Sequence, residues 1–132
     1  MEQNVAMTYI RRSCEEQEIP LQKVGIKTDT AGRYFELTFI SPAVAARYEK
    51  EIQNMSQETG WRLCFSKSVL QNLVLPAAAE SVRAVGLTPL KTPSYMPASN
   101  SVQIRLSERD PVKESKAAEM ILEKTGLPCT FL

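Results

Sequence analysis

The stretch Tyr34–Ile40 reads Tyr-Phe-Glu-Leu-Thr-Phe-Ile, and its apolar and polar side chains alternate, with both phenylalanines and the leucine on one face. This period of two residues is typical of a β-strand that buries one face. The segment Asp29–Gly32 just before it has the Asp-first, Gly-fourth pattern of a type I turn. Together with residues 21–27, which alternate roughly, the stretch predicts a β-hairpin.

A helix and a further strand are expected after the hairpin. Ser41-Pro42 is a capping residue followed by proline, a usual helix start, and apolar residues then recur at helical spacing up to Met55. Thr59-Gly60 supplies the stop, because glycine adopts the left-handed conformation just beyond a last helical turn. Residues 61–65, Trp-Arg-Leu-Cys-Phe, then read as a buried strand.

The last third of the chain repeats this order. Residues 102–106 alternate as the first strand does, Asp110-Pro111 takes the place of the Ser-Pro pair, and Gly126 that of the first stop glycine. The pseudo-repeats span about residues 21–65 and 87–131. Either an internal duplication or the chance recurrence of a common unit explains them.

The predicted fold class is α+β, in one domain over residues 1–132. Two strand-strand-helix-strand units would be joined by a central helix, with helices packed on one side of a mixed or antiparallel sheet. We expect that central helix within residues 68–85, broken or restarted at Pro76. Residues 5–16 predict a short first helix, and the proline-containing residues 87–101 predict a short strand followed by an irregular loop.

The composition excludes most catalytic and metal chemistry. The chain has no histidine, the commonest metal ligand and general base, and its three cysteines, Cys14, Cys64 and Cys129, are isolated. They read as small core residues, so we expect no metal and no cofactor. No segment has the ~18–20 apolar residues of a membrane span, and the start lacks the pattern of a secretion signal. A cytoplasmic, membrane-free protein is the expectation.

The carboxylates do not predict an enzyme. Most glutamates fall where helical patterning turns them toward water, whereas Glu36 lies within a predicted strand that can aim it. One carboxylate without a partner makes a weak active site, and no glycine-rich phosphate loop is present. An enzyme using Glu36 is therefore only the third hypothesis.

Charge is unevenly distributed along a chain whose formal net charge is +1. The section from Thr59 to Ser107 carries a net +4, with Glu80 as its single acid, and the remainder carries −3. Within it, residues 89–101 offer hydroxyls and one tyrosine that can stack on a base while lysines and arginines meet phosphates. The candidate nucleic-acid-binding residues are Arg62, Lys67, Arg83, Lys91, Tyr95 and Arg105.

The leading hypothesis is a non-catalytic accessory domain that binds nucleic acid, single-stranded, through this basic middle section and the loop 89–101. The pattern does not distinguish RNA from DNA. The paired strand and helix units resemble, in broad outline, nucleic-acid modules such as the KH domain, but the G-x-x-G loop of that family is missing. No family is assigned on this outline.

The alternative hypothesis is a protein-interaction or self-assembly module. The chain stops on Thr130-Phe131-Leu132, directly after a predicted strand. Such a strand can pair with another chain through an open sheet edge, which would give a homo-oligomer, or the chain can be one domain of a larger protein. The partner is therefore nucleic acid or another protein.

Overall fold

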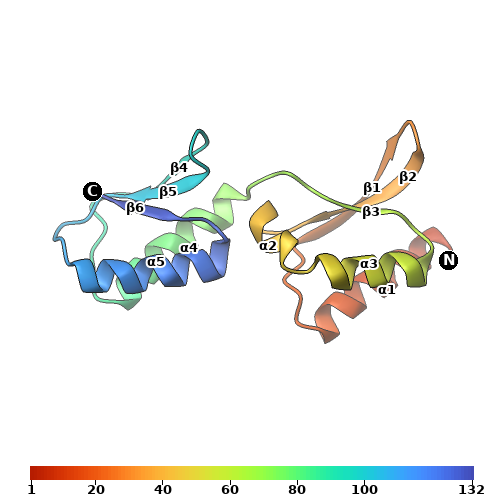
Figure 1. Cartoon of the computed structure of the whole chain (residues 1–132), viewed down its shortest axis with the longest axis horizontal. Helices are drawn as coiled ribbons and strands as arrows, with labels where there is room; N and C mark the ends of the chain where they lie inside the picture. Colours follow the sequence, from red (N-terminus) through yellow and green to blue (C-terminus); the bar gives the residue numbers. More distant parts are fainter. The chain divides into compact units, whose positions relative to one another are not determined.

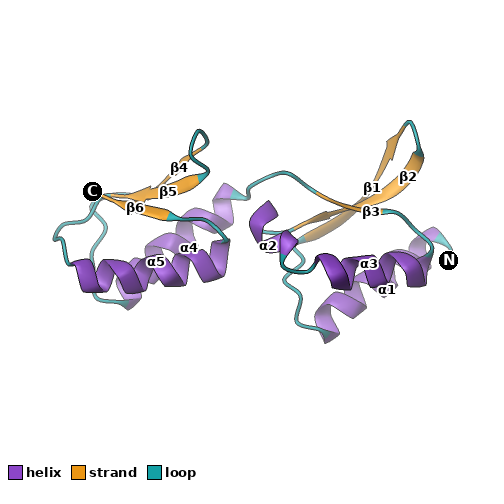
Figure 2. Ribbon diagram, viewed as in Figure 1, coloured by secondary structure: helices purple, strands orange, loops and turns teal.

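The computed structural model describes residues 1–132, which divide by their internal contacts into two compact units, Met1–Val69 and Leu70–Leu132. Each unit has its own helices and its own three-stranded sheet, as Figures 1 and 2 show. Both sheets are mixed, so the α+β class is confirmed. The strands form two separate sheets, one in each unit, within the residues 1–132 that the sequence predicts to be one domain.

The first unit has the order helix, hairpin, helix pair, strand. Its elements are α1 (Gln3–Glu16), β1 (Lys23–Asp29), β2 (Gly32–Thr38), α2 (Pro42–Ala46), α3 (Glu49–Thr59) and β3 (Leu63–Phe65). Strand β1 pairs antiparallel with β2, and β2 pairs parallel with β3. The expected hairpin, helix and strand are confirmed, except that the helix is divided into α2 and α3.

The core of the first unit lies between its sheet and helices α1 and α3 (Figure 1). The alternating residues Phe35 and Leu37 are fully buried, and Phe39 is 2 % exposed. The Phe35 ring packs on Trp61 with 4.8 Å between ring centroids. The two-residue period therefore does divide β2 into a buried face and an outer face.

The second unit has the order helix, hairpin, helix, strand. Its elements are α4 (Gln71–Ala84), β4 (Ser94–Met96), β5 (Ser101–Ile104), α5 (Pro111–Thr125) and β6 (Cys129–Phe131). Strand β4 pairs antiparallel with β5, and β5 pairs parallel with β6. The expectation of an irregular loop before residue 101 is wrong, because β4 forms a hairpin there.

Helix α4 runs through Pro76, so the expected break at this proline is wrong. The helix belongs to the second unit, where it packs against α5. Proline removes one intrahelical hydrogen bond, but the turns that follow Pro76 bury Ala78 and Val82 completely. This packing keeps the helix continuous, since most helical stability in proteins comes from a buried face.

Helices α3 and α5 end in the same way. The hydroxyls of Thr59 and Thr125 each donate to the carbonyl four residues back, and each accepts from the N–H two residues on. The next residues, Gly60 and Gly126, have φ of +72° and +73°, where glycine avoids the Cβ clash. The order of elements is shared by both units, and common origin by duplication stays a prediction.

Val102 and Val112 give a matched test of the second core, because the first is fully buried in β5 and the second is 67 % exposed on α5. Val102→Ala should lower the free energy of unfolding by about 2 kcal/mol, from lost burial and the cavity left behind. Val112→Ala should change it by less than about 0.5 kcal/mol. Urea titration followed by circular dichroism measures both, and equal effects would contradict this core.

Candidate nucleic-acid interface

The sheet of the second unit has one face packed on helices α4 and α5 and one face without a helix, its outer face (Figure 1). Val102 and Ile104 are fully buried, so they point toward the helices. Residues between them in β5 must point the other way. Ser94, Gln103 and Thr130 are cross-strand partners, and they form a polar row over all three strands of the outer face.

Two of the predicted cations lie at the end of this row. Arg105 follows Gln103 by two residues, and its backbone carbonyl accepts from Leu90 at 2.8 Å, which brings the segment before β4 alongside. Lys91 and Arg105 line one small hollow of 40 Å³ together with Ser94 and Gln103. The hollow therefore joins both cations to the polar row.

A second hollow of 270 Å³ adjoins the first, since Lys91 and Thr92 line both. Its rim carries Arg83 from α4 as a further cation. Its apolar wall is formed by Leu75, Pro76, Ala79, Pro89 and Pro93. Lys91 thus lies beside Arg83 in one hollow and beside Arg105 in the other, and we call these three residues the cationic track.

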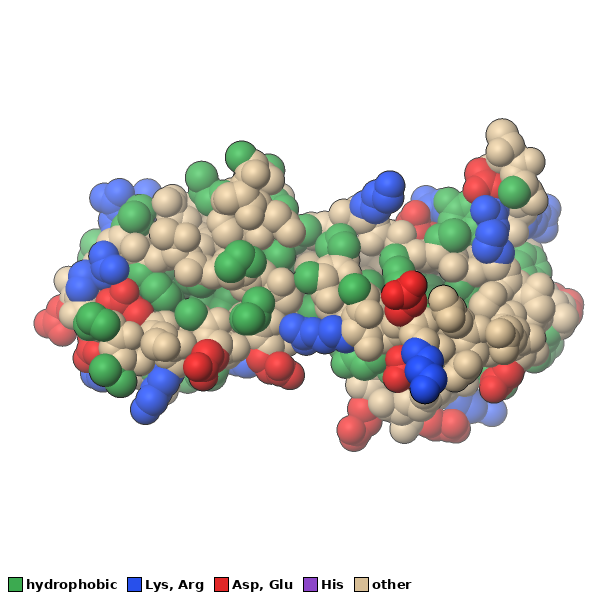
Figure 3. Space-filling model, in the orientation of Figure 1, with side chains coloured by type: hydrophobic (Ala, Val, Ile, Leu, Met, Phe, Trp, Pro, Cys, Tyr) green, Lys and Arg blue, Asp and Glu red, His purple; other side chains and the backbone are tan.

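No acidic side chain forms an ion pair with the cationic track, and the last residue, Leu132, lines the smaller hollow beside Lys91 and Arg105. Arg83, Lys91 and Arg105 are all exposed, and the ion pairs Arg62–Asp29 and Arg109–Glu114 do not involve them. No acidic residue occurs between Glu80 and Glu108. On the face that Figure 3 shows, no carboxylate lies over the β4–β5 hairpin. The outer face is therefore open to an anion.

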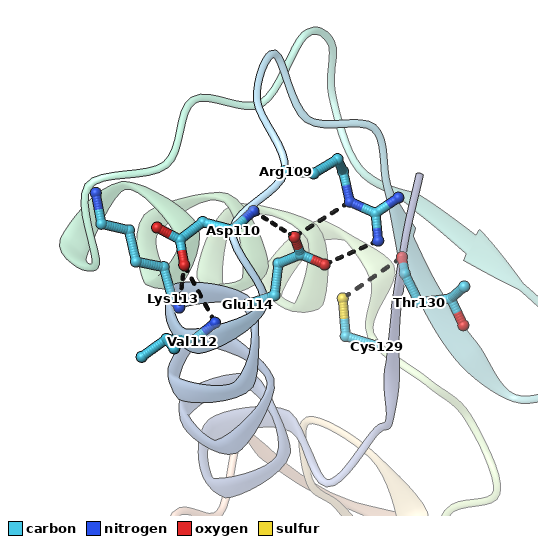
Figure 4. Close-up of polar contacts among 7 residues, drawn as sticks. All are labelled: Arg109, Asp110, Val112, Lys113, Glu114, Cys129 and Thr130. Carbon is cyan, nitrogen blue, oxygen red and sulfur yellow. Dashed lines mark hydrogen bonds and ion pairs between the residues drawn. The ribbon is translucent and has the colours of Figure 1, made fainter.

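The carboxylates that begin α5 are held by local partners (Figure 4). Asp110 caps the helix and accepts from the N–H groups of Val112 and Lys113. Buried Glu114 accepts from the Arg109 guanidinium at 2.9 and 3.1 Å and from the Asp110 N–H at 2.7 Å. The bonds from Arg109 are the main cause that lowers the pKa of Glu114, against a desolvation that raises it.

Tyr95 does not join the outer face. It is the cross-strand partner of buried Val102, so its side chain lies on the helix side of the sheet edge. Its hydroxyl donates to the Asn100 Oδ1 at 2.7 Å, and the ring is half-buried. The base-stacking role expected of Tyr95 has no support in this geometry.

Arg62 and Lys67 belong to the first unit. Arg62 donates two hydrogen bonds to Asp29, at 2.6 and 2.9 Å, and lies 4.5 Å from the centroid of the Tyr34 ring. The Arg62 hydrogen bond also lowers the pKa of Asp29. Lys67 is exposed after β3 and has no ion-pair partner. Neither residue lines the hollows of the cationic track.

Glu36 and the cysteines form no reactive cluster. Glu36 is half-buried on β2, and its cross-strand partners are Gly25 and Cys64, neither of them a charged group. Burial raises the pKa of Cys14 to about 11 and of Cys129 to about 12, so both stay protonated thiols at neutral pH. No group of three or more acidic or cysteine side chains is placed to hold a metal ion.

The sequence predicted the hydroxyls of residues 89–101, among them Ser94, but not Thr130 or the apolar hollow. The signal for Thr130 was its place between Cys129 and Phe131 in a short strand, but its neighbours follow only from the parallel register of β6 on β5. The hollow depends on α4 lying against residues 89–93, which no local pattern encodes.

Comparison with known proteins assigns no relationship. No protein-family model matches the chain, and no curated protein is significantly similar to it. No helix combines the length and the apolar character that crossing a membrane requires. The outer face and the cationic track are therefore the features that bear on function.

The Arg109–Glu114 contact predicts an acid-sensitive stability. Because the folded-state pKa of Glu114 lies below its ordinary 4.5, the stabilisation is complete above about pH 4.5 and is lost as the pH falls through the folded-state value. Glu114→Gln should therefore lower Tm at pH 7, and the gap to the wild type should shrink toward pH 3. Glu119→Gln, exposed on the same helix, is the control for thermal scans. A gap that stays constant with pH would refute the assignment.

Proposed function

We propose that the chain binds single-stranded nucleic acid through the outer face of its second unit, as a non-catalytic accessory domain. The observation that carries the proposal is the sharing of Lys91 by two adjoining hollows, which groups it with Arg83 and Arg105. Three cations without an acidic side chain among them suit a chain of phosphates.

The polar row offers hydrogen-bonding groups beyond those that phosphate binding requires. Gln103 offers an amide donor and an acceptor, and Ser94 and Thr130 offer hydroxyls beside it. Such groups can hydrogen-bond to the Watson–Crick edges of unpaired bases, which base pairing occupies in a duplex. The combination favours a single strand over a double helix.

The binding should be weak and governed by salt. Three cations neutralise few phosphates, and each phosphate contact on a single strand contributes roughly 0.7 to the slope of log K against log salt. With Tyr95 on the other face, no aromatic ring adds stacking energy on the polar row. Low ionic strength is therefore the condition in which to look for binding to RNA and DNA strands alike.

Lys91→Ala combined with Arg105→Ala should weaken binding of all single-stranded sequences about equally. The magnitude of the salt slope should fall by roughly 1 to 1.5, because two phosphate contacts are lost. The control is Lys116→Ala with Lys124→Ala, which removes the same charge from the exposed surface of α5. Fluorescence polarisation with labelled oligonucleotides at several salt concentrations measures both.

Equal loss in the two double variants would show only a net-charge effect and would contradict the assigned surface. Absence of binding by the wild type at low ionic strength would remove the proposed function altogether. Binding that does not change with salt would exclude the phosphate contacts.

Protein association is the second candidate function, favoured by open strand edges. Strands β4 and β6 each pair on one side only, and the same holds for β1 and β3 in the first unit. An edge strand of this kind can add a strand from another chain. Light scattering over a range of concentrations tests self-association, and a constant monomer mass would exclude it.

A further inference from the structure

We infer that the 270 Å³ hollow beside the cationic track holds one unstacked nucleobase, with the adjoining phosphate between Arg83 and Lys91. We call this hollow the proline pocket and define it by Leu75, Pro76, Ala79, Pro89 and Pro93 in its wall. The inference rests on the proposed function and adds the group that the protein would recognise.

The size of the proline pocket suits one flat ring. Pockets for drug-sized ligands have volumes of about 300 to 1,000 Å³, and this hollow lies just below that range. A stacked run of bases or a duplex does not fit such a volume. A single base turned out of its strand does, and proteins commonly receive such bases between apolar side chains.

The wall and the rim of the proline pocket differ in chemistry, and each matches one part of a nucleotide. Three proline rings, a leucine and an alanine form an apolar wall, and proline nitrogens offer no N–H donor. Two cations lie on the rim, with no acid between Glu80 and Glu108 to offset them. A flat, weakly polar ring attached to an anion matches both parts, and a nucleotide within a strand has this form.

The segment that closes the proline pocket is fixed by backbone contacts. Pro89 bridges to Leu106, and the Ser107 N–H donates to the Thr88 carbonyl at 3.0 Å. The prolines at 89 and 93 also restrict the φ angles of the segment. A wall held in this way loses little conformational freedom on binding, which favours affinity.

The proline pocket also adjoins the rest of the proposed interface. Lys91 and Thr92 line it together with the small hollow that reaches Gln103 and Arg105. A strand whose base enters the proline pocket can therefore continue over the polar row with its next phosphates near Arg105. Recognition of one base and electrostatic attraction of its neighbours would act on the same short stretch.

The test compares a ten-unit oligothymidylate with a ten-unit abasic oligomer of equal charge. The wild type should bind the abasic oligomer about tenfold more weakly, since that oligomer has no base to bury against the apolar wall. Ala79→Leu fills the hollow and should bind both oligomers alike, with the affinity of the abasic one unchanged. Ala84→Leu, the same substitution at an exposed position of α4, should keep the discrimination.

A measurement on the unmodified protein accompanies these variants in case Ala79→Leu disturbs the fold. Methyl NMR signals of Leu75 and Ala79 should shift on addition of the oligothymidylate and stay in place with the abasic oligomer. Signals that stay in place with both, or shift alike with both, would overturn the base site. Shifts caused instead by a peptide with a free C-terminal carboxylate would assign the hollow to a peptide.

The outcomes separate the two proposals. If the wild type binds both oligomers equally and Lys91→Ala with Arg105→Ala weakens them, the proposed function stands and the base site is wrong. If the wild type binds neither oligomer at low salt, the proposed function itself fails.

Discussion

The burial of Val102 and Ile104 against one layer of helices is the constraint on which the second unit depends. A three-stranded sheet covered on one side only must send alternate side chains to solvent. Gln103 and Arg105 are therefore placed on the outer face by the apolar residues beside them. The core and the proposed interface are two faces of one alternating segment, so the packing that stabilises the fold also fixes the geometry of the polar row.

The electrostatic character of each cation depends on what folds next to it. Arg62 meets Asp29 across a turn of the first unit and holds it through two hydrogen bonds, so its charge is already compensated. Arg109 is bound in the same way by Glu114. Lys91 and Arg105 come from a part of the chain without acids, and they retain their charge for an external anion. The compensation of Arg62 could not be predicted from the sequence, because Asp29 is 33 residues away in the chain.

Local patterns predicted those elements whose signals are local. The alternation of β2, the caps at Ser41 and Asp110 and the stops at Gly60 and Gly126 act within a few residues, and the helices and strands follow them. The strand β4 was missed because its pairing with β5 depends on a partner rather than on its own proline-rich composition. The side on which Tyr95 lies and the meeting of Arg83 with Lys91 depend on register and helix packing, which a single sequence does not specify.

The two units show that a common order of elements does not impose a common surface. Glu36 and Gln103 occupy the same place in their sheets, each at the centre of the parallel pairing between the middle strand and the last. A carboxylate at this point repels phosphate, whereas an amide can donate to it or to a base edge. The first unit surrounds its carboxylate with Gly25 and Cys64, while the second surrounds its amide with two hydroxyls. The middle strands thus place different chemistry at the same position, a carboxylate in the first sheet and an amide in the second.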